Sequence, residues 1–112
     1  QNGDAWASFG IGLGRCHVGA LLLSRDGFVG VEIYCSDKDA YQGLWNNRDS
    51  AEKMVSDLDG EIVWDDIDMD KKSRTVTAKK AANFDADDWD AMYSWIAQWM
   101  CRMKAIAMRF AG

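Results

Sequence analysis

Four aspartates between positions 65 and 70 are the densest group of side chains that could do chemistry. Asp65, Asp66, Asp68 and Asp70 carry the oxygen ligands that Mg²⁺ and Ca²⁺ prefer. Their spacing lacks the glycine and terminal glutamate of an EF-hand loop. Neighbouring residues of a strand also point to opposite faces of the sheet. We therefore expect a solvated strand end and turn here, with no metal ligand and no cofactor.

The tripeptide Asp70-Lys71-Lys72 has the acid-x-lysine order of one half of a metal-dependent nuclease site. That chemistry requires the acid and the lysine side by side on a strand around a metal ion. Here the tripeptide falls in a predicted turn, so we expect no catalytic residue in it. Lys71 and Lys72, with Arg74 nearby, could contact phosphates, or could form the polar edge of a hairpin.

His17 is the only histidine, and a lone histidine needs a partner before it can act as a base or a nucleophile. A two-residue Asp-Gly turn at 26–27 would place His17 on the same face as Glu32 and Tyr34. A three-residue loop would shift the register by one and turn His17 towards the core. We favour the first register and expect a structural or exposed histidine over a catalytic one. In that register the opposite face is uniformly apolar: Val18, Ala20, Leu22, Val29, Val31 and Ile33.

These side chains are positioned by elements that the apolar pattern predicts. Strands are expected over residues 6–11, 15–23, 28–35, 61–68 and 74–80, the last at or near a sheet edge because it is weakly apolar. A helix is expected over residues 38–58, with a polar stretch at 46–50 that could divide it. The sequence predicts an α+β fold, an antiparallel sheet of four to five strands with two helices on one face, in the order (β)ββα-ββα.

The last helix has the strongest periodicity in the chain. Trp95 lies beside its apolar stripe and Met108 flanks it, which leaves large side chains for a contact. We therefore expect a homodimer or a partner domain to bind through this helix. The stripe itself consists of Trp89, Met92, Tyr93, Ile96, Trp99, Met100, Met103, Ile106, Ala107 and Phe110.

Composition narrows the class of protein. A chain of 112 residues forms a single domain, and it begins at Gln1, so we expect it to be part of a longer protein. The net charge of −5 does not support nucleic-acid binding, and no apolar run is long enough to span a membrane. Three cysteines without a CxxC spacing indicate reduced thiols in the cytoplasm, although Cys16 and Cys35 could face each other across the hairpin.

The ordered set of segments resembles a bacterial and archaeal domain of unknown function that occurs at the C-terminus of restriction-endonuclease-like proteins. The resemblance covers nearly the whole chain and implies a cytoplasmic accessory domain beside a nuclease-like domain that carries the chemistry. It implies no activity for this domain itself. The matching segments are residues 11–18, 29–34, 61–64 and 70–74, and Asp88, Trp89 and Trp95 at the start of the last helix.

Together these observations predict a non-catalytic recognition or interaction domain associated with nuclease-like or defence-type proteins. Its candidate binding residues are His17, Glu32, Tyr34, Lys71, Lys72 and Arg74. One alternative is a small metal-dependent nuclease or hydrolase that uses the acidic cluster. A second alternative is a small-ligand sensor with a pocket between the sheet and the helices.

Overall fold

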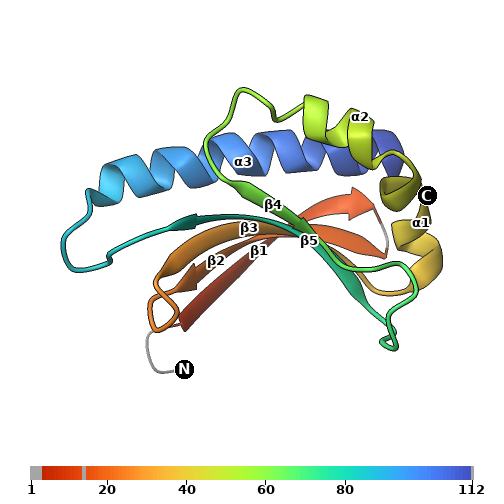
Figure 1. Cartoon of the computed structure of the whole chain (residues 1–112), viewed down its shortest axis with the longest axis horizontal. Coiled ribbons are helices and arrows are strands. Elements are labelled where there is room, and N and C mark those ends of the chain that lie inside the picture. Colours follow the sequence, from red (N-terminus) through yellow and green to blue (C-terminus); the bar gives the residue numbers. More distant parts are fainter. Residues whose placement is uncertain (1–3, 14, 112) are drawn as a thin grey trace.

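The computed structural model describes residues 4–13 and 15–111 and confirms the α+β class (Figure 1). All strand pairs are antiparallel, in the order β1-β2-β3-β5-β4. The elements are β1 (Asp4–Leu13), β2 (Cys16–Leu23), β3 (Phe28–Cys35), α1 (Lys38–Asn46), α2 (Arg48–Lys53), β4 (Glu61–Trp64), β5 (Arg74–Ala81) and α3 (Trp89–Phe110).

The strand order agrees with the prediction that the strand over residues 74–80 lies at or near a sheet edge. Strand β5 lies inside the sheet between β3 and β4, and the short strand β4 is the edge. The sequence of β5 is weakly apolar because only one of its faces is buried. Val76 and Ala78 point into the core, while Thr75 and Thr77, which alternate with them, lie on the opposite face. Strand β4 ends at Trp64, four residues earlier than expected.

The predicted first helix is two helices. Asp37 caps α1 by accepting a hydrogen bond from the backbone N–H of Ala40 at 2.8 Å. Asn47 ends it, because its backbone N–H bonds Leu44 O and its side-chain amide donates to Gly43 O. The polar stretch at 46–50 therefore divides the segment, as its composition allowed.

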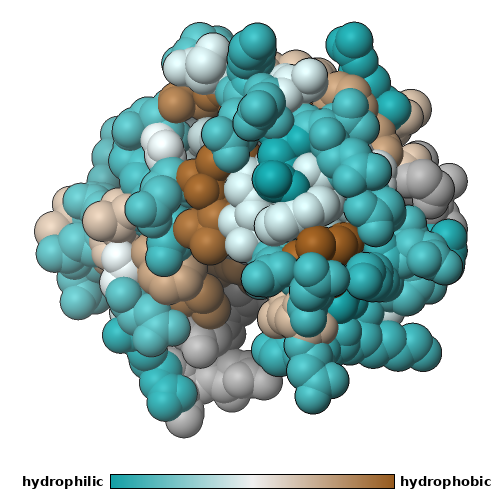
Figure 2. All heavy atoms as spheres, turned by 45° about the vertical axis from the view of Figure 1, so that its right-hand side comes forward, coloured by the Kyte–Doolittle hydropathy of each residue, from teal (hydrophilic) through white to brown (hydrophobic). Residues whose placement is uncertain are grey.

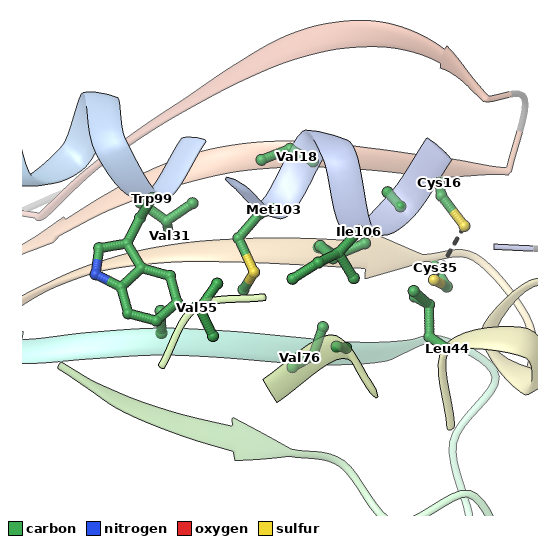
Figure 3. Close-up of a cluster of buried hydrophobic side chains, with 14 of the residues drawn as sticks. Cys16, Val18, Val31, Cys35, Leu44, Val55, Val76, Trp99, Met103 and Ile106 are labelled. Carbon is green, nitrogen blue, oxygen red and sulfur yellow. Dashed lines mark hydrogen bonds between the residues drawn. The ribbon is translucent and has the colours of Figure 1, made fainter. Parts of the chain in front are cut away.

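Helix α3 crosses one face of the sheet, and its buried side chains form one side of the core (Figure 1, Figure 3). Trp99, Met103 and Ile106 pack against the apolar face of β2, β3 and β5. The prediction for Trp95 was wrong: it is 6% exposed, whereas Trp89 and Tyr93 are 40% and 56% exposed. The buried stripe is Met92, Trp95, Trp99, Met103, Ile106 and Ala107.

The loop after α2 is tied to α3 by a two-pronged ion pair. The Arg102 guanidinium donates to both carboxylate oxygens of Asp57 at 2.6 and 2.8 Å, and to Met54 O at 2.8 Å. These hydrogen bonds lower the pKa of Asp57 to about 2 from an ordinary value of 3.8. Since the folded pKa is the lower one, the stabilisation is present above the ordinary value and is lost as the pH falls towards 2.

We expect the melting temperature of the Asp57→Asn variant to fall less on acidification than the melting temperature of the parent chain. The difference should develop between roughly pH 4 and pH 2, where only the parent protonates this carboxylate. Melting curves at closely spaced pH values measure it. Asp49→Asn, a change at an exposed position on α2, is the control. If the melting temperature of Asp57→Asn falls with pH as steeply as that of the parent chain, the ion pair with Arg102 does not lower the pKa of Asp57.

The molecular surface at the α1 and α2 end is mainly hydrophilic, with only small hydrophobic areas between charged and polar side chains (Figure 2). One lysine and two arginines of this region pair with acids of neighbouring segments: Lys38 with Asp68, Arg15 with Asp37 and Arg102 with Asp57. This end of the molecule therefore presents no extended apolar area in that view.

Candidate binding surface

The face of the sheet opposite α3 is the main candidate surface, and we call it the open face. Alternate residues of each strand point to it, since side chains alternate between the faces of a sheet. In the described part of the chain, the helices pack on the other face (Figure 1). The side-chain positions of the open face are His17, Gly19, Leu21, Leu23, Phe28, Gly30, Glu32, Tyr34, Glu61, Val63, Thr75, Thr77, Lys79 and Ala81.

The hairpin register places His17 on this face by a different turn from the one expected. Leu23 pairs with Phe28, so the loop has four residues, closed by a hydrogen bond from Asp26 N to Leu23 O at 3.1 Å. Gly27 takes a left-handed conformation, with φ +73°. The register differs from the predicted one by two residues, and a shift of two leaves every side chain on its predicted face.

His17 and Tyr34 are direct cross-strand partners, and their rings stack with centroids 4.9 Å apart and planes 24° from parallel. Tyr34 pairs on its other side with Thr75. Glu32 lies in the neighbouring row, between Gly19 and Thr77. The structure therefore brings three of the six predicted binding residues, His17, Glu32 and Tyr34, onto one face.

The open face is more apolar towards the hairpin loop between β2 and β3, and none of the predicted binding residues lies there. Leu21, Leu23 and Phe28 are half-buried there, and none of them packs against the core cluster. Val63, on the edge strand β4, is 43% exposed. The alternation of β2 and β3 was a usable signal for these side chains, whereas the position of Val63 depends on the long-range pairing of β4 with β5.

One lysine stands on the open face among these apolar residues. The Lys79 ammonium lies 5.3 Å from the centre of the Phe28 ring and 3.8 Å from a carboxylate oxygen of Glu61. An ammonium over an aromatic ring is attracted by the negative face of that ring. The positive charge is thus offset locally by Glu61, so this face is mixed in charge and not cationic.

The three basic residues of the predicted site are not part of the open face. Lys71 and Lys72 are exposed in the loop between β4 and β5. Arg74 is only 5% exposed, and its guanidinium donates to four loop carbonyls at 2.8–3.1 Å: Ile67, Met69, Lys71 and Lys72. Arg74 therefore organises the loop, and its predicted role in a basic surface gains no support from this geometry.

The aspartates between positions 65 and 70 make structural contacts in the same loop. Asp65 accepts hydrogen bonds from the backbone N–H and hydroxyl of Thr75 at 2.8 and 3.2 Å. Asp66 accepts from the backbone N–H of Asp68, whose own carboxylate pairs with Lys38 at 3.2 Å. Among the residues that the structure describes, no three His, Cys, Asp or Glu side chains are grouped to hold a metal ion.

The space between the sheet and the helices is filled by side chains, with a small pocket at its margin. This pocket, of about 270 Å³, lies between the end of β5 and the start of α3. Its volume is below the usual range for small-molecule sites, about 300–1,000 Å³. Its lining mixes Val29, Met92 and Trp95 with Lys80, Asp87 and Asp88, so the pocket gives a ligand-sensing role little support.

Comparison with known proteins places the chain in a family. The family described as "Domain of unknown function (DUF4268)" matches residues 1–110, and the chain therefore belongs to this family. No curated protein and no solved structure matches the chain. Within residues 4–13 and 15–111, no helix is long and apolar enough to cross a membrane.

Proposed function

We propose that this chain is a non-catalytic recognition domain whose open face binds a partner protein. The observation that supports the proposal is the run of half-buried apolar and aromatic side chains on a sheet face that no described helix covers. Interface cores are enriched in aromatic residues, which often contribute most of the binding energy. Tyr34 and Phe28 are suited to that role, with the aliphatic side chains around them supplying contact area.

Charge favours a protein over a nucleic acid as the partner. Binding to a phosphate backbone depends on several cations that displace counterions. The open face offers Lys79, which lies beside Glu61, and the chain carries a net charge of −5. Lys71 and Lys72 lie in the loop beyond the sheet and do not extend this face.

For the partner itself we propose a nuclease-like domain of a DNA-processing or defence-type protein in the cytoplasm. The support is the ordered resemblance of segments 11–18, 29–34, 61–64 and 70–74 to domains that accompany restriction-endonuclease-like proteins. The free thiols of all three cysteines agree with a reducing compartment. In this arrangement the partner domain carries the catalysis, and the present domain positions it.

Titration calorimetry of the purified chain with a nuclease-like domain from a protein of this family tests the proposal. We expect Val63→Asp to weaken binding at least about tenfold, because it places an uncompensated charge in an apolar interface. Val63 is already exposed, so the melting temperature should change little. The matched control is Met108→Asp, which adds the same charge at a 60% exposed position on α3 and should leave the affinity unchanged.

Two results would contradict the proposal. If Met108→Asp weakens binding and Val63→Asp does not, the contact uses the outer side of α3. If the chain instead binds DNA or RNA, and the combined Lys71→Ala and Lys72→Ala changes abolish that binding, the basic loop is the functional surface. Salt titration identifies nucleic-acid binding, because contacts to phosphates weaken steeply as the ionic strength rises.

A further inference from the structure

Two cysteines meet at one end of the core, close to the start of α1. Cys16 is the first residue of β2 and Cys35 is the last residue of β3, and they are cross-strand partners. Their sulfur atoms lie 3.0 Å apart, and both residues are free thiols (Figure 3). The third cysteine, Cys101, is exposed on α3.

The backbone ladder places this pair where a disulfide can form without moving the strands. Ser36 N–H donates to Arg15 O at 2.9 Å, which makes Arg15 and Ser36 a hydrogen-bonded pair. The pairs alternate along an antiparallel ladder, so Cys16 and Cys35 occupy the next, non-hydrogen-bonded pair. The Cα atoms of such a pair lie about 4.5 Å apart. That separation falls within the range of about 4.4–6.8 Å found in disulfides.

The two thiols differ in access and in acidity. Cys16 is 4% exposed and follows Arg15 in the chain, whereas Cys35 is fully buried. The hydrogen bond between the two sulfur atoms, helped by the Arg15 charge, lowers the pKa of the Cys16 thiol even though burial opposes this. The same hydrogen bond, together with burial, raises the pKa of the Cys35 thiol. Of the two thiols, Cys16 is therefore the one that ionises more readily.

We propose that Cys16 and Cys35 are a redox modification site that hydrogen peroxide converts to a disulfide. Peroxide is favoured over bulky disulfide oxidants because the pair is almost entirely buried. The sulfur atoms need to approach by only about 1 Å to reach the S–S bond length. The bond would lock β2 to β3 directly before the Asp37 cap that starts α1.

The reaction balances as a two-electron oxidation. The Cys16 thiolate attacks one peroxide oxygen, the O–O bond breaks, and the released hydroxide takes the Cys35 thiol proton to give water. Cys16 is then a sulfenic acid. The Cys35 sulfur attacks the Cys16 sulfur, the S–O bond breaks, and the hydroxide leaves as water with a solvent proton. Two thiols are oxidised, and one peroxide is reduced to two waters.

The test uses the Cys101→Ser chain, so that the exposed thiol cannot link two molecules. After treatment with hydrogen peroxide, alkylation in denaturant and mass spectrometry should show loss of two hydrogen atoms and a peptide that joins Cys16 to Cys35. The melting temperature should rise by roughly 5–15 °C, because the bond closes a chain segment of intermediate length. Dithiothreitol should reverse both changes.

Cys35→Ser provides the matched comparison, because it removes the sulfur of Cys35 and keeps the sulfur of Cys16. In that variant peroxide should leave Cys16 as a sulfenic acid, detectable with a dimedone tag, without any rise in melting temperature. The proposal is overturned if both thiols of the Cys101→Ser chain remain open to alkylation after peroxide. A peptide map in which each cysteine is separately over-oxidised, without a joined peptide, overturns it equally.

Discussion

Replacing Arg74 with methionine is expected to lower the free energy of unfolding by about 3 kcal/mol, a large effect for a residue that the sequence suggests is on the surface. Arg74 is 5% exposed, and its guanidinium donates to the carbonyls of Ile67, Met69, Lys71 and Lys72. Hydrogen bonds from a charged group contribute roughly 1.5–3 kcal/mol each. In the variant, water can donate to some of the carbonyls that lose the guanidinium, which reduces the total cost. Methionine keeps much of the volume but none of the donors.

Urea denaturation of the two chains measures the change, with Lys72→Met as the control. Lys72 is an exposed lysine of the same loop, so its replacement should alter the stability by no more than about 0.5 kcal/mol. Hydrogen exchange gives a second readout, because amides at 65–73 should lose protection in Arg74→Met before the core does. A loss of less than about 1 kcal/mol would show that the four carbonyls do not depend on this side chain.

The contrast between Arg74 and the hairpin shows what sequence patterns can determine here. Alternation along β2 and β3 predicts which residues share a face. The predicted faces are correct although the turn is longer than expected. The reason is that a shift of two residues preserves the alternation. The amino-acid pattern is therefore sufficient to place His17, Glu32 and Tyr34 together, while their binding role stays a prediction.

Features that depend on segments far apart in the chain could not be predicted in this way. The interior place of β5 results from its pairing with β3, a strand that lies before both α1 and α2 in the chain, and the local composition of β5 does not reveal it. The guanidinium of Arg74 likewise bonds carbonyls that no side-chain pattern encodes. In α3, aromatic residues occur on several sides of the helix, so periodicity alone could not separate buried Trp95 from exposed Tyr93.

The orientation of α3 is fixed instead by a contact with the loop before β4. The indole N–H groups of Trp95 and Trp99 both donate to the backbone carbonyl of Asp59, at 2.6 and 2.8 Å. The next residue, Gly60, has φ +138°, a conformation that residues with a side chain rarely adopt. This loop therefore holds two tryptophans with one carbonyl, and it needs glycine directly after that carbonyl.

Gly60→Ala is accordingly expected to lower the free energy of unfolding by about 2–4 kcal/mol. One part is the strained backbone, which costs of order 1–3 kcal/mol. The other part is steric, because an added Cβ would lie 3.1 Å from Trp95 and 3.3 Å from Trp99, atoms of rings that are packed in the core. Urea denaturation followed by tryptophan fluorescence would report both the lost stability and the disturbed indoles.

Gly27→Ala separates the two parts of this cost. Gly27 also has a positive φ, +73°, but an added Cβ there would meet only Ala82 O at 3.9 Å. Its replacement should therefore cost about 1–2 kcal/mol of backbone strain and leave the native fluorescence unchanged. If Gly60→Ala were no more destabilising than Gly27→Ala, the tryptophans would not be packed against this loop. The excess in Gly60→Ala thus measures how closely the loop before β4 fits the face of α3.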